Sequence, residues 1–187
     1  MEKKVIVFFG MTASGKSTLA GTYAAANAIP YYNTDRMRKK LAGLLPTDKR
    51  PDAVGKGIYS ADFTRKTYAA MLKQAAVDME QGQSVVFLDG SYSNLEEREA
   101  VVEMAGQYDA TPLFIYCTCS ADEVRRRLQK RAVDETAVSD GRWEIYQHQL
   151  KAFVDPALGT GGRLVTLDTE QKLSALLKTV ERLLAQE

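Results

Sequence analysis

The stretch that decides the fold of this chain is Val5-Ile6-Val7-Phe8-Phe9-Gly10-Met11-Thr12-Ala13-Ser14-Gly15-Lys16-Ser17. Its first five residues are apolar, β-branched or aromatic without a break, which predicts a strand buried on both faces of a parallel sheet. The glycine-rich turn that follows has the form G-x-x-x-x-G-K-[ST], and a helical segment then runs to about Asn27. A strand, a turn of this form and a helix in this order predict a phosphate-binding loop, the P-loop.

Four other segments repeat the apolar strand pattern along the chain. They are Ile29 to Asn33, Ser84 to Leu88, Leu113 to Cys117 and Arg163 to Leu167. Helical patterns lie between them. In Ala61 to Gln81 the apolar residues recur every three or four positions, and Gly82 follows as a stop signal. Alternating strands and helices predict an α/β fold in which right-handed crossovers connect a parallel sheet covered on both faces.

Serine-to-glutamate pairs with the spacing of a capping box predict two further helix starts. They are Ser93 with Glu96 and Ser120 with Glu123. Gln171 to Ala185 predicts the last helix of the chain. Residues 45–59 are rich in Pro, Gly, Asp and Lys, and this stretch is too long for an ordinary connection in a compact domain. A second polar stretch runs from Ala132 to Gly141.

Length and composition suit a single domain over residues 1–187. The chain has 187 residues, of which 45% are hydrophobic, which allows a substantial core. Its formal charge of +1 provides no overall basic field to hold nucleic acid or anionic lipid. Only the five apolar residues Val5 to Phe9 precede the glycine-rich turn, far fewer than a signal peptide or a membrane span needs. We therefore expect a cytoplasmic protein without a membrane partner, with Cys117 and Cys119 as buried reduced thiols.

The P-loop has the residue types that binding of a polyphosphate requires. Glycines let phosphate oxygens approach the backbone closely, while the loop amides and the helix N-terminus solvate the phosphate charge. We expect Lys16 to reach the β- and γ-phosphates of ATP as a mobile cation, and Ser17 to coordinate Mg²⁺. The predicted nucleotide-binding residues are Gly10, Met11, Thr12, Ala13, Ser14, Gly15, Lys16, Ser17 and Thr18.

Asp89 follows the buried strand pattern directly, at the place where a P-loop protein needs a carboxylate for its metal ion. We therefore expect Asp89 and Ser17 to be the metal-binding residues for Mg²⁺. The alternative is that Asp89 only caps a turn, because Gly90 comes next.

Asp35 lies just beyond the second strand pattern, and Arg38 follows three positions later on the same face of the predicted helix. A carboxylate at the carboxyl edge of the sheet can accept the proton of an acceptor hydroxyl, and the arginine can orient that acceptor. The alternative is that Asp35 only caps a helix whose surface carries several cations. These cations are Arg36, Arg38, Lys39 and Lys40.

Arginines crowd one helix ahead of the second polar stretch. Arg127 and Arg131 lie four positions apart on one face. From the far side of ATP they can clamp the transferred phosphoryl group when residues 131–142, the lid segment, close over the nucleotide. The alternative is a charged outer face of the helix, since exposed arginines are common there.

With these residues placed, the chain resembles the P-loop kinases related to polynucleotide kinase, zeta toxin and gluconate kinase. It is most similar to the ATP-binding domain that bacteria carry alone or fused to aminoglycoside-phosphotransferase-like domains. The likeness runs over nearly the whole length. It rests on the P-loop, Thr34-Asp35-Arg36-Met37-Arg38-Lys39, the strand ending at Asp89, Arg127-Leu128-Gln129-Lys130-Arg131, and Ser139-Asp140.

This resemblance implies a three-layer P-loop fold with the strand order 2-3-1-4-5 and a helical lid. It implies that Asp35 is the general base and that Arg38 binds on the acceptor side. Where Asp89-Gly90-Ser91 stands, many relatives read Asp-Ala-Thr, a departure that leaves the carboxylate in place. Family membership does not name a substrate.

We therefore expect an ATP-dependent phosphotransferase that acts on a hydroxyl of a small molecule, as a monomer or homodimer, with Lys16, Asp35, Arg38, Arg127 and Arg131 as catalytic residues. Two alternatives remain open. A 5′-hydroxyl nucleic-acid kinase would hold a backbone with Lys49, Arg50 and Lys56 of the long polar stretch. A non-enzymatic module would bind ATP and alter the behaviour of a partner without an acceptor.

Overall fold

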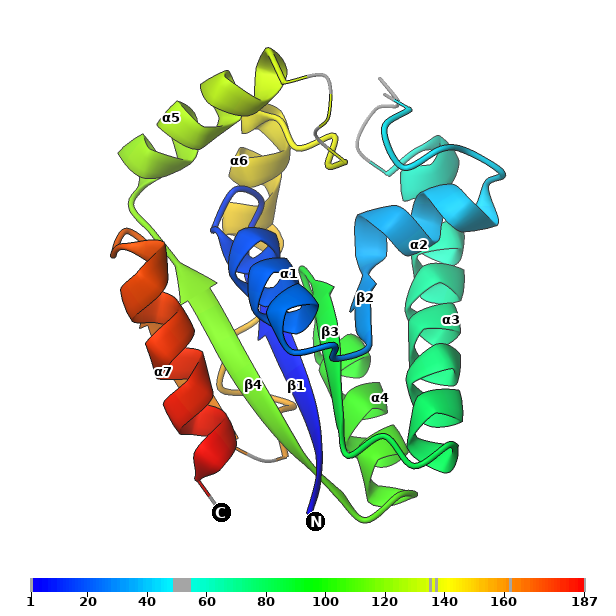
Figure 1. The fold of residues 1–187 in the computed structure, drawn as a ribbon. Coiled ribbons are helices and arrows are strands. Elements are labelled where there is room, and N and C mark those ends of the chain that lie inside the picture. The colour runs from blue at the N-terminus through cyan, green and yellow to red at the C-terminus, as the bar shows by residue number, and fades with distance from the viewer. Residues whose placement is uncertain (1, 49–54, 135, 137, 162, 187) are drawn as a thin grey trace.

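The computed structural model describes residues 2–48, 55–134, 136, 138–161 and 163–186. Its centre is a parallel sheet of five strands in the order β2-β3-β1-β4-β5, which confirms the expected fold (Figure 1). The strands are β1 (Lys3–Phe9), β2 (Tyr31–Asn33), β3 (Val85–Gly90), β4 (Ala110–Thr118) and β5 (Arg163–Asp168).

The helices follow the strands in the alternation that the sequence predicts. They are α1 (Lys16–Ala26), α2 (Thr34–Leu41), the short 3₁₀ helix η1 (Gly57–Tyr59), α3 (Ala61–Glu80), α4 (Leu95–Gly106), α5 (Ala121–Ala132), α6 (Trp143–Ala152) and α7 (Leu173–Ala185). No helix in the described part of the chain is long and apolar enough to span a bilayer.

The apolar run of β1 serves both faces of the sheet because successive side chains point to opposite sides. Val5, Val7 and Phe9 pack with residues of α3 and α4, whereas Ile6 and Phe8 pack with residues of α1 and α7. The result is three layers, with α3 and α4 on one face and α1 and α7 on the other (Figure 1). The carboxyl ends of the strands meet at one edge, where α2, α5 and α6 also lie.

Two predicted helix starts differ from those in the structure. Helix α4 is capped by Asn94, whose side chain accepts a hydrogen bond from the Glu97 amide, so the predicted start at Ser93 is one residue early. Asparagine caps a helix at least as well as serine, and it stands in register with its own glutamate. Helix α7 begins at Leu173 rather than at Gln171. The predicted cap of α5 is confirmed, since Ser120 Oγ accepts from the Glu123 amide.

A fully buried arginine on α4 fixes the connection between α6 and β5. The guanidinium of Arg98 donates to the backbone carbonyls of Asn94, Val154, Asp155 and Leu158, at distances of 2.6 to 3.2 Å. It also lies over the rings of Phe9 and Phe153. This single cation satisfies carbonyls that no regular element pairs, and it thereby sets where α6 leaves the core.

We predict that Arg98→Met lowers the free energy of unfolding by about 3 kcal/mol or more, because it removes the donor of the Val154 and Leu158 carbonyls and of the turn at Asp155. Equilibrium unfolding in urea, followed by circular dichroism, measures the change. Arg65→Met is the matched control, since the Arg65 side chain is 72% exposed. Similar losses in the two variants would show that Arg98 does not organise this connection.

Candidate functional site

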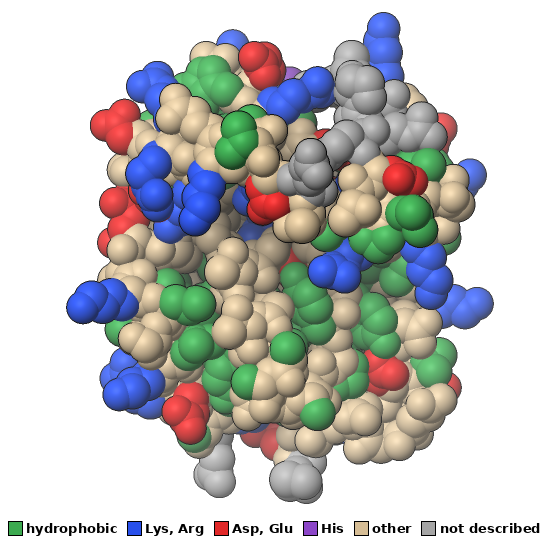
Figure 2. Space-filling view, turned by 45° about the horizontal axis from the view of Figure 1, so that its top comes forward, with side chains coloured by type: hydrophobic (Ala, Val, Ile, Leu, Met, Phe, Trp, Pro, Cys, Tyr) green, Lys and Arg blue, Asp and Glu red, His purple; other side chains and the backbone are tan. Residues whose placement is uncertain are grey.

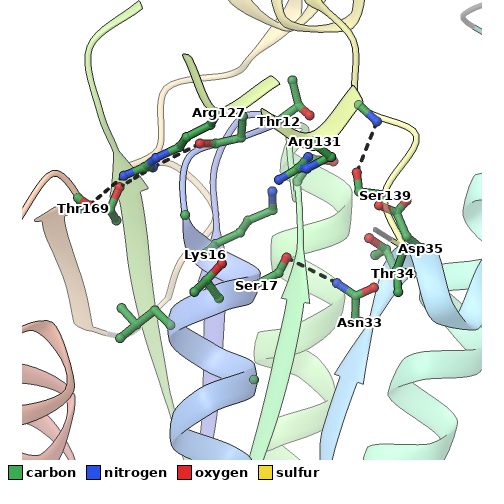
Figure 3. Close-up of a pocket in the computed structure, with 18 of the residues that line it drawn as sticks. Thr12, Lys16, Ser17, Asn33, Thr34, Asp35, Arg127, Arg131, Ser139 and Thr169 are labelled. Carbon is green, nitrogen blue, oxygen red and sulfur yellow. Dashed lines mark hydrogen bonds between the residues drawn. The ribbon is translucent and has the colours of Figure 1, made fainter. Parts of the chain in front are cut away.

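A cavity of about 730 Å³ opens at the carboxyl edge of the sheet. It is lined by the P-loop, by the start of α2, by the last turns of α5, and by residues 138–141 of the lid segment. Lys and Arg side chains gather on the surface over α5 beside this cavity (Figure 2). Figure 3 shows Lys16, Asp35 and Arg131 in one pocket, so the structure brings together residues that the sequence separates widely.

The P-loop backbone takes a shape that few residues tolerate. Gly10 has φ of 140°, and a Cβ there would collide with the carbonyl oxygen of Cys117 on β4. Ala13 has φ of 60°, in the left-handed region, although it is not glycine. Gly15, with φ of 87°, precedes the first residue of α1. The loop therefore closes around a space that faces the N-terminus of α1, the arrangement that binds anions.

Lys16 Nζ donates to the carbonyl oxygen of Met11 across the loop, at 3.2 Å. The side chain is thus folded over the P-loop, within the pocket that Figure 3 shows.

Side chains from outside the P-loop hold its backbone in place. Thr169, after β5, is 5% exposed, and its hydroxyl donates to the Ser14 carbonyl oxygen at 2.6 Å. Gln149 of α6 accepts a hydrogen bond from the Thr12 amide at 2.7 Å. Neither residue is predicted from the sequence. Neither belongs to a motif, and only the tertiary fold brings them to the loop.

Arg127, one of the two arginines expected to clamp the phosphoryl group, forms hydrogen bonds with protein atoms around the P-loop. Its guanidinium donates to the Ala13 carbonyl, to the hydroxyl and carbonyl of Thr169, and to the Glu123 carboxylate, at 2.7 to 3.1 Å. Hydrogen bonds from Arg126, and then from Arg127, lower the pKa of the Glu123 carboxyl to about 2. Arg127 therefore ties α5 to the P-loop, because its donors are already engaged by protein oxygens.

Arg131, one helical turn later, differs from Arg127 in its surroundings. Within the described part of the chain its guanidinium forms no hydrogen bond or ion pair, and it points into the pocket beside Lys16 (Figure 3). Burial lowers the pKa of Arg131, and the charge of Asp35 opposes this effect. A partly buried cation without a hydrogen-bonding partner is suited to receive an anion.

Asn33 lies between Ser17 and Asp89, the two residues expected to bind the metal ion. Its amide nitrogen lies 2.7 Å from Asp89 Oδ2 and 3.5 Å from Ser17 Oγ. Tyr31 also donates to Asp89 Oδ2, and burial together with this carboxylate raises the pKa of Tyr31 well above its ordinary value. The other oxygen, Asp89 Oδ1, is buried and has no hydrogen-bond partner in the described structure. Asn33 is not predicted from the sequence, because only the register of β2 and β3 pairs it with Asp89.

Asp35 and Arg38 face the same cavity, at the end opposite Thr169. Arg38 Nη1 lies 3.8 Å from Asp35 Oδ1, while Nε donates to the Ile58 carbonyl and Nη2 to Thr64. The guanidinium lies over the ring of Tyr59. Arg38 and Lys39 are both buried, so the alternative of a helix surface that carries these cations is wrong for these two positions. Asn33, not Asp35, is the residue whose side chain caps α2.

Of the three residues expected to hold a nucleic-acid backbone, the structure describes Lys56 alone. Lys56 is exposed and does not contribute to the lining. Lys49 and Arg50 lie outside the described residues.

Comparison with known proteins assigns the chain to a family. The model of a family described as AAA domain matches residues 5–156, so the chain belongs to this family. An uncharacterized protein of Mycobacterium tuberculosis and one of Mycobacterium bovis are each 26% identical over 123 residues, which are 66% of this chain and 24% of theirs. The chain thus spans about a quarter of the length of these curated relatives.

Solved structures show the same fold at low sequence identity. A candidate kinase from Chloroflexus aurantiacus has a TM-score of 0.71 and 20% identity, covering 98% of this chain and 96% of its own. A gluconokinase from Sinorhizobium meliloti has a TM-score of 0.59 and 20% identity, covering 98% and 95%. A shikimate kinase from Acinetobacter baumannii, in complex with shikimate, has a TM-score of 0.64 and 13% identity, covering 99% and 94%. The protein has the fold of the P-loop kinases.

We predict that Arg127→Met lowers the free energy of unfolding by about 2 to 4 kcal/mol. The variant leaves the Thr169 carbonyl without this donor, and it leaves the Ala13 carbonyl with only the weak Cys119 thiol donor. Arg131→Met is the matched control on the same helix face. It should change this free energy by less than about 0.5 kcal/mol, because no hydrogen bond is lost. Urea unfolding without nucleotide measures both. Equal losses would contradict the different roles of the two arginines.

Proposed function

We propose that this protein is a kinase that transfers the γ-phosphoryl group of Mg-ATP to a hydroxyl of a small molecule. One observation carries the proposal. A single cavity is lined at one end by the P-loop with Lys16 and Arg131, and at the other by Asp35 beside Arg38. Cations suited to a polyphosphate and a carboxylate suited to a hydroxyl thus face each other across one space.

The nucleotide end of the site binds through charge and through backbone amides. The amides of the P-loop and the positive end of α1 solvate the β-phosphate, and Lys16 exchanges the Met11 carbonyl for phosphate oxygens. Arg131 approaches the γ-phosphoryl group from the lid segment. Charge that develops on this group in the transition state is stabilised most where water is excluded and the donors are already in place.

The residues at the metal position fit Mg²⁺. The buried Asp89 Oδ1 has no hydrogen-bond partner in the described structure. The Asn33 amide contacts both the other oxygen of this carboxylate and Ser17 Oγ. One hydroxyl, one carboxylate, phosphate oxygens and water make a ligand set that Mg²⁺ accepts. No cluster of three or more acidic, His or Cys side chains occurs among the described residues, and such a site does not need one. Ser17 would bind the ion directly, with Asp89 holding it or its water, and the ion would neutralise phosphate charge.

The acceptor end supplies a base and a fixed frame. Asp35 accepts the proton of the attacking hydroxyl, and Arg38 holds the carboxylate from the side. The hydrogen bonds of Arg38 to Ile58 and Thr64 prevent its guanidinium from swinging into the cavity. Asp35 therefore keeps its orientation when the acceptor enters, and orientation of this kind lowers the barrier to in-line transfer.

A screen with γ-³²P-labelled ATP tests the proposed reaction. The protein is incubated with Mg-ATP and pools of sugars, nucleosides, antibiotics and 5′-hydroxyl oligonucleotides, and labelled products are separated. We expect transfer to a small-molecule pool. Label found only in oligonucleotides would instead support a nucleic-acid kinase, and tight ATP binding with no transfer to any pool would support a module that only binds nucleotide.

We predict that Asp35→Asn lowers transfer to the acceptor by at least about a hundredfold, because the amide keeps the shape of the carboxylate but takes no proton. Calorimetric titration should give an affinity for Mg-ATP within a few fold of the wild type. Asp48→Asn serves as the control, since Asp48 lies outside the cavity. If Asp35→Asn transfers phosphate at the wild-type rate, Asp35 is not the base.

A further inference from the structure

Lys39 on α2 is a lysine with no exposed surface. Its ammonium lies 2.6 Å from the Val138 carbonyl oxygen, 3.1 Å from the Pro46 carbonyl oxygen and 3.3 Å from Asp140 Oδ2. Two of these three partners belong to the lid segment. A buried ammonium is strongly destabilised unless its donors are paired, so docking of residues 138–140 against α2 is a condition for Lys39 to lie where it does.

The Asp140 carboxylate also connects the lid segment to the acceptor end of the site. Asp140 Oδ2 also accepts a hydrogen bond from Tyr59 Oη at 2.7 Å. The Tyr59 ring lies beneath the Arg38 guanidinium, whose Cζ is 4.9 Å from the ring centre. Arg38 in turn faces Asp35. An unbroken series of contacts therefore joins Asp140 to the carboxylate that we propose as the base.

The next residue of the lid segment lies at the nucleotide end. A Cβ at Gly141 would collide with Thr12 Oγ1 of the P-loop, and it would lie 3.1 Å from Arg131 Nη1. Four consecutive residues, 138–141, thus contact α2 and η1 on one side and the P-loop with Arg131 on the other. If a bound nucleotide moves Arg131, it therefore also affects residues 138–141, which Lys39 holds against α2.

We propose that Lys39 is a positioning residue that links the two ends of the site, so that docking of the lid segment and placement of Asp35 with Arg38 occur together. This inference rests on the function proposed above and adds a form of regulation to it. Lys39 touches neither substrate. It acts through Asp140 and Tyr59, and its burial favours the docked arrangement of residues 138–140.

The coupling between the nucleotide end and the acceptor end is reciprocal. Nucleotide that stabilises the docked lid segment also stabilises the acceptor end, and by thermodynamic reciprocity an acceptor seated against Asp35 raises the affinity for nucleotide. Without Lys39, Arg131 can still bind the phosphates. Nucleotide binding then no longer stabilises the positions of Tyr59 and Arg38. If Lys39 has a purely structural role, its replacement lowers the stability of the protein, but nucleotide binding still affects the acceptor end.

Hydrogen exchange resolved by mass spectrometry distinguishes these roles, and it needs no acceptor. The probe is Mg²⁺ with a non-hydrolysable analogue of ATP, and exchange is followed in the P-loop and in residues 57–68, which cover η1 and the start of α3. In the wild type we expect the analogue to slow exchange in both regions, by about fivefold or more in residues 57–68, a typical size for coupling between sites. In Lys39→Met we expect slowing in the P-loop only.

Lys40→Met is the matched control, since Lys40 is the exposed neighbour on the same helix and should behave as the wild type. If Lys39→Met does not fold, Tyr59→Phe gives the same test, because it removes only the hydroxyl that joins Tyr59 to Asp140. In that variant too, slowing in residues 57–68 should be lost while slowing in the P-loop persists.

The outcomes separate this inference from the proposed function. No slowing in the wild-type P-loop would contradict nucleotide binding and hence the function itself. Slowing in the P-loop with none in residues 57–68 of the wild type would overturn the linkage alone. Slowing that reaches residues 57–68 equally in the wild type and in folded Lys39→Met or Tyr59→Phe would reduce Lys39 to a structural residue.

Discussion

The backbone at Ala13 turns through a left-handed conformation, with φ of 60°, and much of the site depends on the contacts that hold it there. Such a conformation costs about 1 kcal/mol or more for a residue with a Cβ. Arg127 binds the Ala13 carbonyl, Thr169 binds the Ser14 carbonyl, and Gln149 binds the Thr12 amide. These hydrogen bonds from outside the loop hold the Ala13 and Ser14 carbonyls and the Thr12 amide in place. The loop is therefore preorganised for phosphate before nucleotide binds.

This constraint explains why elements distant in sequence converge on one loop. Arg127 comes from α5, Gln149 from α6, and Thr169 from the segment after β5. The position of α6 depends in turn on Arg98, which gathers the carbonyls of the connection that follows it. A small apolar cluster of Ala13, Val124, Leu128 and Tyr146 packs the P-loop against α5 and α6. The two helices on either side of the lid segment, α5 and α6, are therefore anchored to the P-loop.

Local patterns predicted the parts of the molecule that depend on local physics. The run Val5 to Phe9 and the glycines of the P-loop predict strand, turn and helix because sterics and burial act over a few residues. The place of Asp89 at the carboxyl end of a buried strand was also predictable, because the apolar residues before it mark that strand. The burial of Lys39 and the engagement of Arg127 by protein oxygens were not. Val138 lies about a hundred positions from Lys39, and Thr169 lies about forty positions from Arg127, so no local pattern predicts these contacts.

The proposed function depends first on whether the P-loop binds the phosphates of a nucleotide. Titration of ¹⁵N-labelled protein with Mg-ATP, Mg-ADP and adenosine, followed by amide NMR, tests it most directly. We expect the amide signals of Gly15, Lys16 and Ser17 to shift on addition of ATP and ADP but not of adenosine. The affinity should fall as phosphates are removed. Equal affinity for adenosine and ATP, or P-loop amides that do not respond to ATP, would contradict the proposed binding.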